Sequence, residues 1–428
     1  MKKVYLSIIG FSILCRLNAY SQVKRDSTST KPFTFLHNLI SRDSTHYNPR
    51  QLRLDEIDFV SSYYSQNGDH SAVTGGIGTE KVTDIATGLN LNFVWTNHNN
   101  NKNTLVAGLG FDYHTAASQA YVSKTGASSP TGTRLYPSLD WTVENSKTGN
   151  TFGVGAYVSD EYNYKSLGAD LHYSVKTADK NGEFSAKLQG YFDHVTLIYP
   201  SEFVPLSVSS IYSSDNGNHH GSNGHRDNFG SSPRETYSAA FSYSQIINSR
   251  LQIAFLADVV GQNGYLGLPF HRVYFTNGRD TIEKLPSSRY KLPLGVRLNY
   301  FLGDNVILRS YYRYYLDSWG VRSNTANLEM VYKISPFFSI SPFYRFYNQS
   351  AARYFAPYEV HNSTDEYYTS NYEFSKFNSQ FYGLGFRIAP PTGVFGIKNL
   401  HELEIRYGHY TQTTDLVSDV VSVSLGFK

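Results

Sequence analysis

The chain has 428 residues, and its 38 Lys and Arg against 35 Asp and Glu give a formal net charge of +3. A balance this close to neutral gives no indication of a nucleic-acid partner. The only cysteine is Cys15, close to the N-terminus, so the chain beyond it is predicted to contain no disulfide, thiolate metal site or cysteine nucleophile.

The N-terminal segment has the layout of a cleavable secretory signal peptide. Lys2 and Lys3 precede an apolar run from Val4 to Cys15, and small residues follow it. We expect the signal peptide to cover residues 1–21; Leu14, directly before the cysteine, disfavours the alternative of a lipid-anchored lipoprotein. The signal holds three basic residues and no acid, so its removal leaves a net charge of about 0.

Residues 22–53 are rich in Ser, Thr and Lys, and we expect a periplasmic tail there with one short helix around 35–40. Beyond the tail, apolar residues alternate with small or polar ones, as between Leu105 and His114, which is typical of strands with one face toward lipid and one toward water. Sixteen strands are predicted, at 54–65, 82–97, 103–114, 133–146, 150–160, 164–178, 182–197, 234–247, 249–262, 288–302, 304–317, 322–335, 337–350, 374–389, 399–410 and 416–428.

The predicted connections alternate between short turns and long segments. Long ones are expected at Gln66 to Lys81, Thr115 to Gly132, Ile198 to Pro233, Asn263 to Ser287 and Ala351 to Glu373. In bacterial outer-membrane barrels short turns face the periplasm and long loops face outside. Pro390 to Lys398 is a longer turn on the side expected to be periplasmic.

These features predict an all-β fold, an antiparallel transmembrane β-barrel of about 16 strands over residues 54–428 with both termini periplasmic. The last strand alternates Val421, Val423, Leu425 and Phe427 with small or polar residues, which resembles the C-terminal strand by which outer-membrane barrels are recognised for insertion. A large soluble β-sandwich or propeller is the alternative, but several predicted strands exceed the usual soluble length of about 5–6 residues. The expected location is therefore the bacterial outer membrane.

The predicted inward face carries charges whose sign changes along the chain, acidic in the first half and arginine-rich later. We take as lumen candidates Asp112, Asp140, Asp170, Arg297, Arg309, Arg313, Arg345 and Arg387. The same face is expected to include Asp58, Glu144, Lys187, Asp193, Asp258, Lys333, Glu402, Glu404 and Arg406. Such charges either set a field across an open channel, pair across a plugged interior, or form a salt-bridged wall without selectivity.

The most unusual segment is Ser71 to Glu80, SAVTGGIGTE. Its glycines permit positive φ and close backbone approach, and its hydroxyls and carboxylate offer polar groups. We name as loop or binding candidates Ser71, Thr74, Gly75, Gly76, Gly78, Thr79 and Glu80. Three interpretations stay open: a loop that packs at the barrel mouth, a ligand- or ion-binding loop, and covalent flavin attachment, for which the Thr-Gly core lacks the expected neighbours.

Neither a metal site nor catalysis is predicted. Asp215, His219, His220, His225 and Asp227 fall in one polar loop, but without a fixed ligand spacing. No G-x-S-x-G elbow occurs, and the pairs Asp112 with His114 and Asp170 with His172 are more typical of a polar lumen than of acid–base machinery. We expect no enzyme and no cofactor.

The run Glu56 to Glu80, EIDFVSSYYSQNGDHSAVTGGIGTE, with the Gly-rich strand after it, resembles an outer-membrane β-barrel family of Bacteroidetes-type bacteria that has no assigned activity and is marked by this loop. The resemblance covers nearly the whole chain after the signal. It implies an outer-membrane barrel, and the family's association with flavin-attaching transferases and thioredoxin-like proteins implies a redox context.

We therefore predict a porin-like or gated channel for a small polar or charged solute, its entrance narrowed by the Ser71–Glu80 loop. The alternative is a non-conducting binding or assembly platform linked to a flavin or redox system. Expected partners are outer-membrane lipid, the barrel-assembly machinery and, for the platform, periplasmic redox proteins.

Overall fold

The computed structural model describes residues 51–115, 131–161, 164–197 and 231–428, and residues 52–428 form one compact unit. The expected signal peptide, nearly all of the tail and the helix at 35–40 lie outside the described residues, as does the histidine-containing loop around His219. Within the described residues, no helix is both long and apolar enough to cross a membrane.

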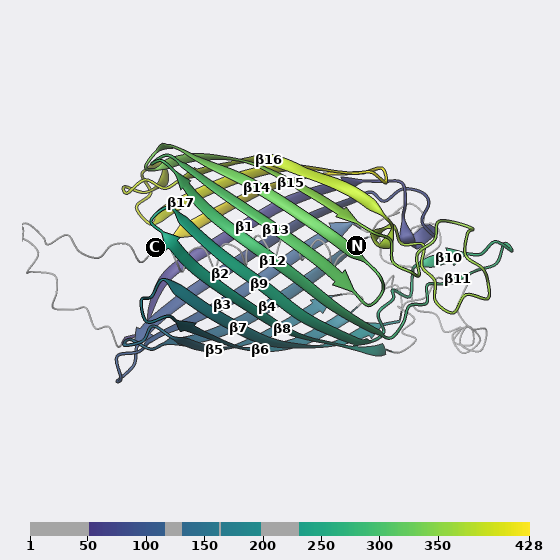
Figure 1. Ribbon diagram of the computed structural model, residues 1–428, viewed down its shortest axis with the longest axis horizontal. Coiled ribbons are helices and arrows are strands. Elements are labelled where there is room, and N and C mark those ends of the chain that lie inside the picture. The colour runs from purple at the N-terminus through teal and green to yellow at the C-terminus, as the bar shows by residue number, and fades with distance from the viewer. Residues whose placement is uncertain (1–50, 116–130, 162–163, 198–230) are drawn as a thin grey trace, which may run out of the picture. The chain divides into compact units, whose positions relative to one another are not determined.

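Sixteen antiparallel strands form a closed barrel in the described unit (Figure 1). They are β1 (Arg53–Asn67), β2 (Val82–Thr96), β3 (Lys102–Thr115), β4 (Thr131–Glu144), β5 (Thr151–Glu161), β6 (Tyr164–Lys176), β7 (Gly182–Thr196), β8 (Ser231–Asn248), β9 (Leu251–Gly264), β12 (Ser288–Leu302), β13 (Val306–Asp317), β14 (Arg322–Ser335), β15 (Phe338–Gln349), β16 (Phe377–Ile388), β17 (Leu400–Gln412) and β18 (Leu416–Phe427). The predicted fold class is confirmed.

The first and last strands close the barrel. β1 pairs with β18 from Ile57 opposite Phe427 to Asn67 opposite Val417, and every other barrel strand pairs with its neighbours along the chain. Closure matters because an open strand edge in lipid would leave backbone N–H and C=O groups without hydrogen-bond partners.

The alternating sequence pattern separates the two faces of the wall. On β3 the outward residues Leu109 and Phe111 are 49% and 45% exposed. Asp112, which follows Phe111 and points to the other face, is 7% exposed. The same alternation continues around the barrel, with Leu139 and Trp141 on β4 and Leu167 and Leu171 on β6 among the exposed apolar side chains. An outer surface of this composition suits contact with hydrocarbon rather than water.

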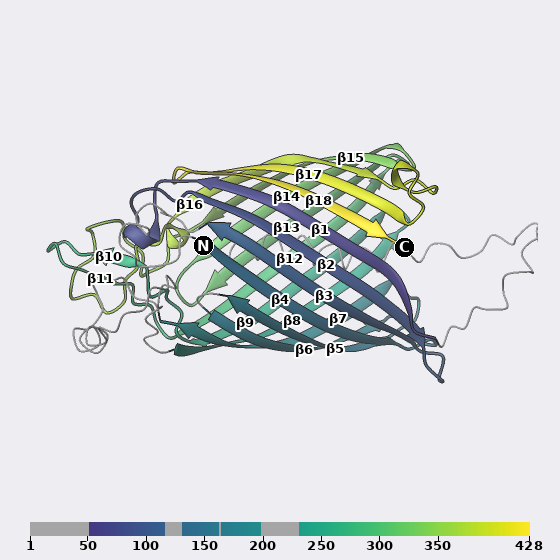
Figure 2. The same cartoon turned by 180° about the vertical axis from the view of Figure 1, so that it is seen from behind.

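The two ends of the barrel differ. Short turns join strands at the end where the C-terminus lies, and long connections extend from the other end, as both views show (Figures 1 and 2). The connection from β9 to β12 contains a further hairpin, β10 (Arg272–Tyr274) paired with β11 (Asp280–Ile282). By the usual rule the long connections mark the outer side.

The predicted strands agree with the observed ones to within three residues at either end. The largest displacements are the start of β8, at 231 instead of 234, and of β16, at 377 instead of 374. The sequence prediction missed β10 and β11, since three-residue strands show no period. The long turn before β17 contains a short 3-10 turn at Val394–Gly396.

Candidate functional site

The Ser71–Glu80 loop folds back on itself at the outer end of β1. Ala72–Thr74 form one 3-10 turn, and Gly75, Gly76 and Gly78 take φ values of 79°, 87° and 78°, which favour glycine. The amide of Gly76 donates to the carbonyl of Ser71 at 2.8 Å, and the amide of Ser71 donates to the carbonyl of Gly78 at 3.2 Å. The glycines therefore close a tight loop.

Two other outer connections lock this loop in place. A Cβ on Gly75 would lie 2.5 Å from the ring of Tyr274, and one on Gly76 would lie 2.6 Å from the carbonyl oxygen of Ser370. Buried Arg272 donates from Nη1 to the carbonyl of Val73 at 2.6 Å. We call the three connections 68–81, 265–287 and 350–376 together the cap.

A ring stack joins the first and third connections of the cap. His70 lies parallel to Tyr372, with ring centroids 3.7 Å apart and an interplanar angle of 4°. The Nδ1 of His70 donates to the carbonyl of Gly76 at 3.0 Å, which fixes the ring orientation. The stack and the hydrogen bond together hold the loop against the third connection.

Glu283 joins the second and third connections. One carboxylate oxygen accepts from the amide of Leu268 at 2.6 Å and lies 3.2 Å from Nδ1 of His271, and the other accepts from the hydroxyl of Thr369 at 2.8 Å. Burial alone raises the pKa of Glu283, but His271 and these hydrogen bonds outweigh it and leave the pKa below its ordinary value. The buried carboxylate is thus satisfied as an anion.

Glu80 ends the loop in a different electrostatic setting. It is 4% exposed, and burial together with the nearby carboxylates of Glu373 and Asp69 raises its pKa to about 8. At neutral pH this carboxyl group is mostly protonated, in contrast to Glu283. The cap therefore contains two buried acids with opposite preferences for the proton.

The remaining candidate residues of the Ser71–Glu80 loop differ in solvent exposure. Ser71 is fully buried and Thr79 is exposed. The hydroxyl of Thr74 donates to the carbonyls of Ser71, at 3.3 Å, and Ile77 within the loop itself. The hydroxyls of Ser71 and Ser370 are buried without a hydrogen-bond partner among the described residues. What the structure displays here is packing, and ligand binding by these residues stays a prediction.

The inner wall brings most of the lumen candidates into contact with neighbours. Asp112 accepts from the hydroxyl of Tyr136 at 2.8 Å, and Arg387 pairs with Glu402 at 2.8 Å. The guanidinium groups of Arg313 and Arg345 lie over aromatic rings, 5.6 Å from Tyr315 and 5.5 Å from Phe381, respectively. Arg297 alternates on β12 with the exposed apolar residues Leu294 and Val296, which places it on the inward face. Asp140 and Asp170 meet around a histidine, described below.

Glu329 on β14 forms ion pairs with two arginines. It lies 3.8 Å from Arg309 on the adjacent strand and 2.9 Å from Arg406 on β17, which also contacts Glu404 at 3.2 Å. Because β15 and β16 separate β14 from β17, the Arg406 side chain crosses the inner surface, over the ring of Phe343 at 4.9 Å. Part of the charged wall is thus a salt-bridged network.

Sequence reasoning missed Arg272, His271 and Glu283, the residues that join the cap together. The available signal was Asn277-Gly278, a dipeptide typical of a tight hairpin, which would have placed Arg272 and Glu283 on its two flanks. Their contacts to residues far away in sequence had no local signature.

A closed 16-strand barrel with an apolar outer surface, a charged inner wall and long loops at one end is a bacterial outer-membrane β-barrel. The chain belongs to the family described as "Protein of unknown function (DUF3570)", whose model matches residues 45–420.

No curated protein matches the chain. Solved structures of similar fold include the outer membrane protein OprD from Pseudomonas aeruginosa, at 10% identity and a TM-score of 0.40, covering 87% of this chain and 93% of that one. A BenF-like porin from Pseudomonas fluorescens Pf-5 shares 7% identity, with a TM-score of 0.40 and coverage of 87% and 98%. A structure titled "Bacterial polysaccharide outer membrane secretin" shares 11%, with a TM-score of 0.42 and coverage of 89% and 99%.

Proposed function

We propose that this barrel is a porin-like channel that passes a small polar or charged solute across the outer membrane, with the cap narrowing its outer entrance. The observation that supports the proposal most is the wall itself: a closed ring of strands carries charged side chains of both signs on its inward face. Barrels of 16 strands have room for an aqueous channel, unlike eight-stranded ones.

The wall chemistry favours a solute that is polar or charged. The acidic residues lie on β3 to β6: Asp112, Asp140 and Asp170. The basic residues lie on β12 and β13, in a different part of the closed ring of strands: Arg297, Arg309 and Arg313. Opposed charges of this kind orient a passing dipole or ion and bias which charges enter. The cap supplies the restriction, because three interlocked connections lie at one mouth of the barrel.

The second candidate is a non-conducting platform for binding or assembly, coupled to a flavin or redox system. It is favoured by the specific contacts that join the three connections of the cap, among them Arg272 to Val73 and Glu283 to Thr369. In this case periplasmic redox proteins are the partners. Contact with outer-membrane lipid and insertion by the barrel-assembly machinery are part of both proposals, as is a non-enzymatic role.

Planar-bilayer recording of the purified full chain separates the two. Intact protein is compared with a variant lacking residues 68–79, and both are first checked for folding by heat-modifiable migration on gels. A stable conductance that rises on deletion supports the capped channel. Absence of conductance in both folded proteins would exclude it, and mass spectrometry of the same sample tests whether Thr74 or Thr79 carries a flavin.

A further inference from the structure

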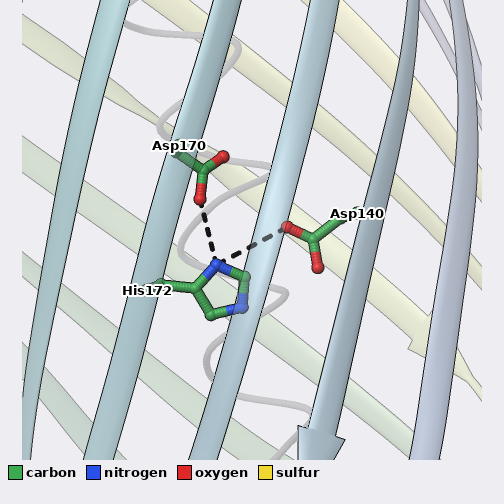
Figure 3. Close-up of side chains that lie close together, drawn as sticks. All are labelled: Asp140, Asp170 and His172. Carbon is green, nitrogen blue, oxygen red and sulfur yellow. Dashed lines mark hydrogen bonds and ion pairs between the residues drawn. The ribbon is translucent and has the colours of Figure 1, made fainter.

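A cluster of side chains on the inner wall lies apart from the cap. Asp140 on β4 and Asp170 and His172 on β6 converge above the strand between them, β5 (Figure 3). The Nδ1 atom of His172 lies 3.0 Å from one oxygen of Asp170 and 3.8 Å from one oxygen of Asp140. One ligand atom from each residue lies within 4.8 Å of the other two.

Two glycines on β5 make this convergence possible. A Cβ on Gly153 would lie 2.1 Å from Nε2 of His172, and one on Gly155 would lie 2.2 Å from a carboxylate oxygen of Asp170. Side chains from two strands that are not hydrogen-bonded to each other therefore meet over a bare stretch of wall. Because a side chain at either glycine would collide with the cluster, the glycines on β5 leave the space that the cluster occupies.

Neighbouring groups hold one oxygen of each carboxylate and leave the other directed at His172. Oδ2 of Asp170 accepts from the hydroxyl of Tyr157 and lies 3.2 Å from Nζ of Lys187. Oδ1 of Asp140 accepts from the hydroxyl of Thr142 at 3.1 Å. The remaining oxygens, Oδ1 of Asp170 and Oδ2 of Asp140, are the ones nearest Nδ1.

The same hydroxyl fixes the proton on the histidine. Thr142 donates its only hydrogen to Asp140, so its oxygen accepts from Nε2 of His172 at 2.9 Å, which places a hydrogen on Nε2. Nδ1 lies at hydrogen-bond distance, 3.0 Å, from Oδ1 of Asp170, so a hydrogen on Nδ1 satisfies both of these atoms. A divalent cation that takes the place of this hydrogen would bind the Nδ1 lone pair together with the two carboxylate oxygens that already face it.

We propose that Asp140, Asp170 and His172 form a divalent transition-metal site on the inner wall, with Zn²⁺ as the best-suited ion. Zn²⁺ binds one imidazole nitrogen and two carboxylate oxygens at about 2.0–2.2 Å, which in a tetrahedron puts ligand atoms roughly 3.3 Å apart. The observed 3.0 and 3.8 Å bracket that spacing. The fourth position is left for water or a solute donor atom.

The surroundings match the second layer of contacts that metal sites require. Thr142 orients the imidazole through Nε2, and Tyr157 and Lys187 orient the Asp170 carboxylate. The Lys187 ammonium compensates one of the two carboxylate charges. The empty site, counted as Asp140, Asp170 and Lys187, therefore has a net charge near −1. That balance predicts exchangeable rather than permanent binding.

The test is calorimetric titration of Zn²⁺ into the full chain, purified in detergent and stripped with chelator, carrying His219, His220 and His225 changed to Gln so that the polar loop does not bind. We expect a single site. Asp140→Asn and His172→Gln should each weaken it at least tenfold, and Thr142→Val about ten- to hundredfold. His114→Gln is the matched control, since His114 forms the same two-residue pattern with Asp112 on β3, and it should leave Zn²⁺ affinity unchanged.

Zinc-edge X-ray absorption on the same loop-substituted, otherwise unaltered chain keeps the test independent of whether the site variants fold. One imidazole with oxygen ligands is expected. Failure to bind Zn²⁺, binding unaffected by both ligand substitutions in folded protein, or coordination by two or more imidazoles would each overturn the assignment. None of these outcomes depends on whether the barrel conducts.

Discussion

Arg272 donates a hydrogen bond of 2.6 Å to the backbone carbonyl of Val73, a residue 199 positions earlier in the chain. Both residues are buried, so the guanidinium group reaches into the folded Ser71–Glu80 loop instead of water. The contact joins the β10–β11 hairpin to the loop after β1, and it makes the cap a single structure built from distant parts of the sequence.

Replacing Arg272 by Ala should loosen the loop without unfolding the barrel. A hydrogen bond from a charged donor contributes about 2 kcal/mol, so exchange of the loop amides between 71 and 80 should accelerate about thirtyfold. Hydrogen–deuterium exchange with peptide-level mass spectrometry measures this. Arg279→Ala, on the exposed turn of the same hairpin, is the matched control and should leave these amides unchanged.

Gly76 and Gly78 allow the packing of the loop to be separated from its backbone conformation. Alanine at either position must adopt a left-handed φ at a cost of roughly 1–2 kcal/mol. Only at Gly76 does the new methyl group also meet a backbone oxygen, that of Ser370 at 2.6 Å, whereas at Gly78 the nearest atom is 3.6 Å away. Gly76→Ala should therefore open the cap more than Gly78→Ala.

Bilayer recordings of the two glycine variants check this difference. We expect a larger mean conductance for Gly76→Ala than for the unaltered chain and a smaller change for Gly78→Ala. Equal currents in the two variants would mean that contact with the third connection does not restrict the entrance.

The barrel could be predicted from sequence because the alternation of outward apolar and inward polar residues can be recognised within each single strand. Leu109, Phe111 and Asp112 show which side faces out within four residues, and the turn lengths set the order of strands. The cap lacked such a rule, since Glu283 contacts Thr369, 86 residues later in the third connection, and the two are brought together only by the closed barrel. Only part of the cluster of Asp140, Asp170 and His172 could be predicted from sequence. Asp170 and His172 form a two-residue pattern on one strand, but Asp140 comes close to them only across the glycines of β5.

Glu329 should control the charge preference of the channel. Its carboxylate compensates Arg406 and Arg309, so Glu329→Gln removes one negative charge from the inner wall and leaves two guanidinium groups less neutralised. The reversal potential in a potassium chloride gradient should move toward chloride selectivity. Asp415→Asn, in an exposed turn between β17 and β18, should leave it in place; an equal shift in both variants would contradict a role for the wall network.

Glu80 should make the cap looser as pH rises. Its pKa is about 8 in the folded protein, against an ordinary value of 4.5, so between these values the closed cap binds a proton that the opened loop would release. The stabilisation is complete below about pH 4.5, falls as pH increases, and is lost once pH passes about 8. The facing carboxylates of Glu373 and Asp69 act in the same direction, since both oppose ionisation of Glu80.

A nitroxide on Cys introduced at exposed Ile77 reports this change, because Cys15 lies in the expected signal peptide and the described residues contain no cysteine. The mobile fraction of its electron paramagnetic resonance spectrum should rise between pH 5 and pH 8.5. Glu80→Gln, which keeps the neutral shape at every pH, should flatten the profile, while Glu366→Gln at an exposed position of the cap should preserve it. Mobility that increased toward low pH, or an unchanged profile in Glu80→Gln, would show that the buried proton on Glu80 does not hold the cap closed.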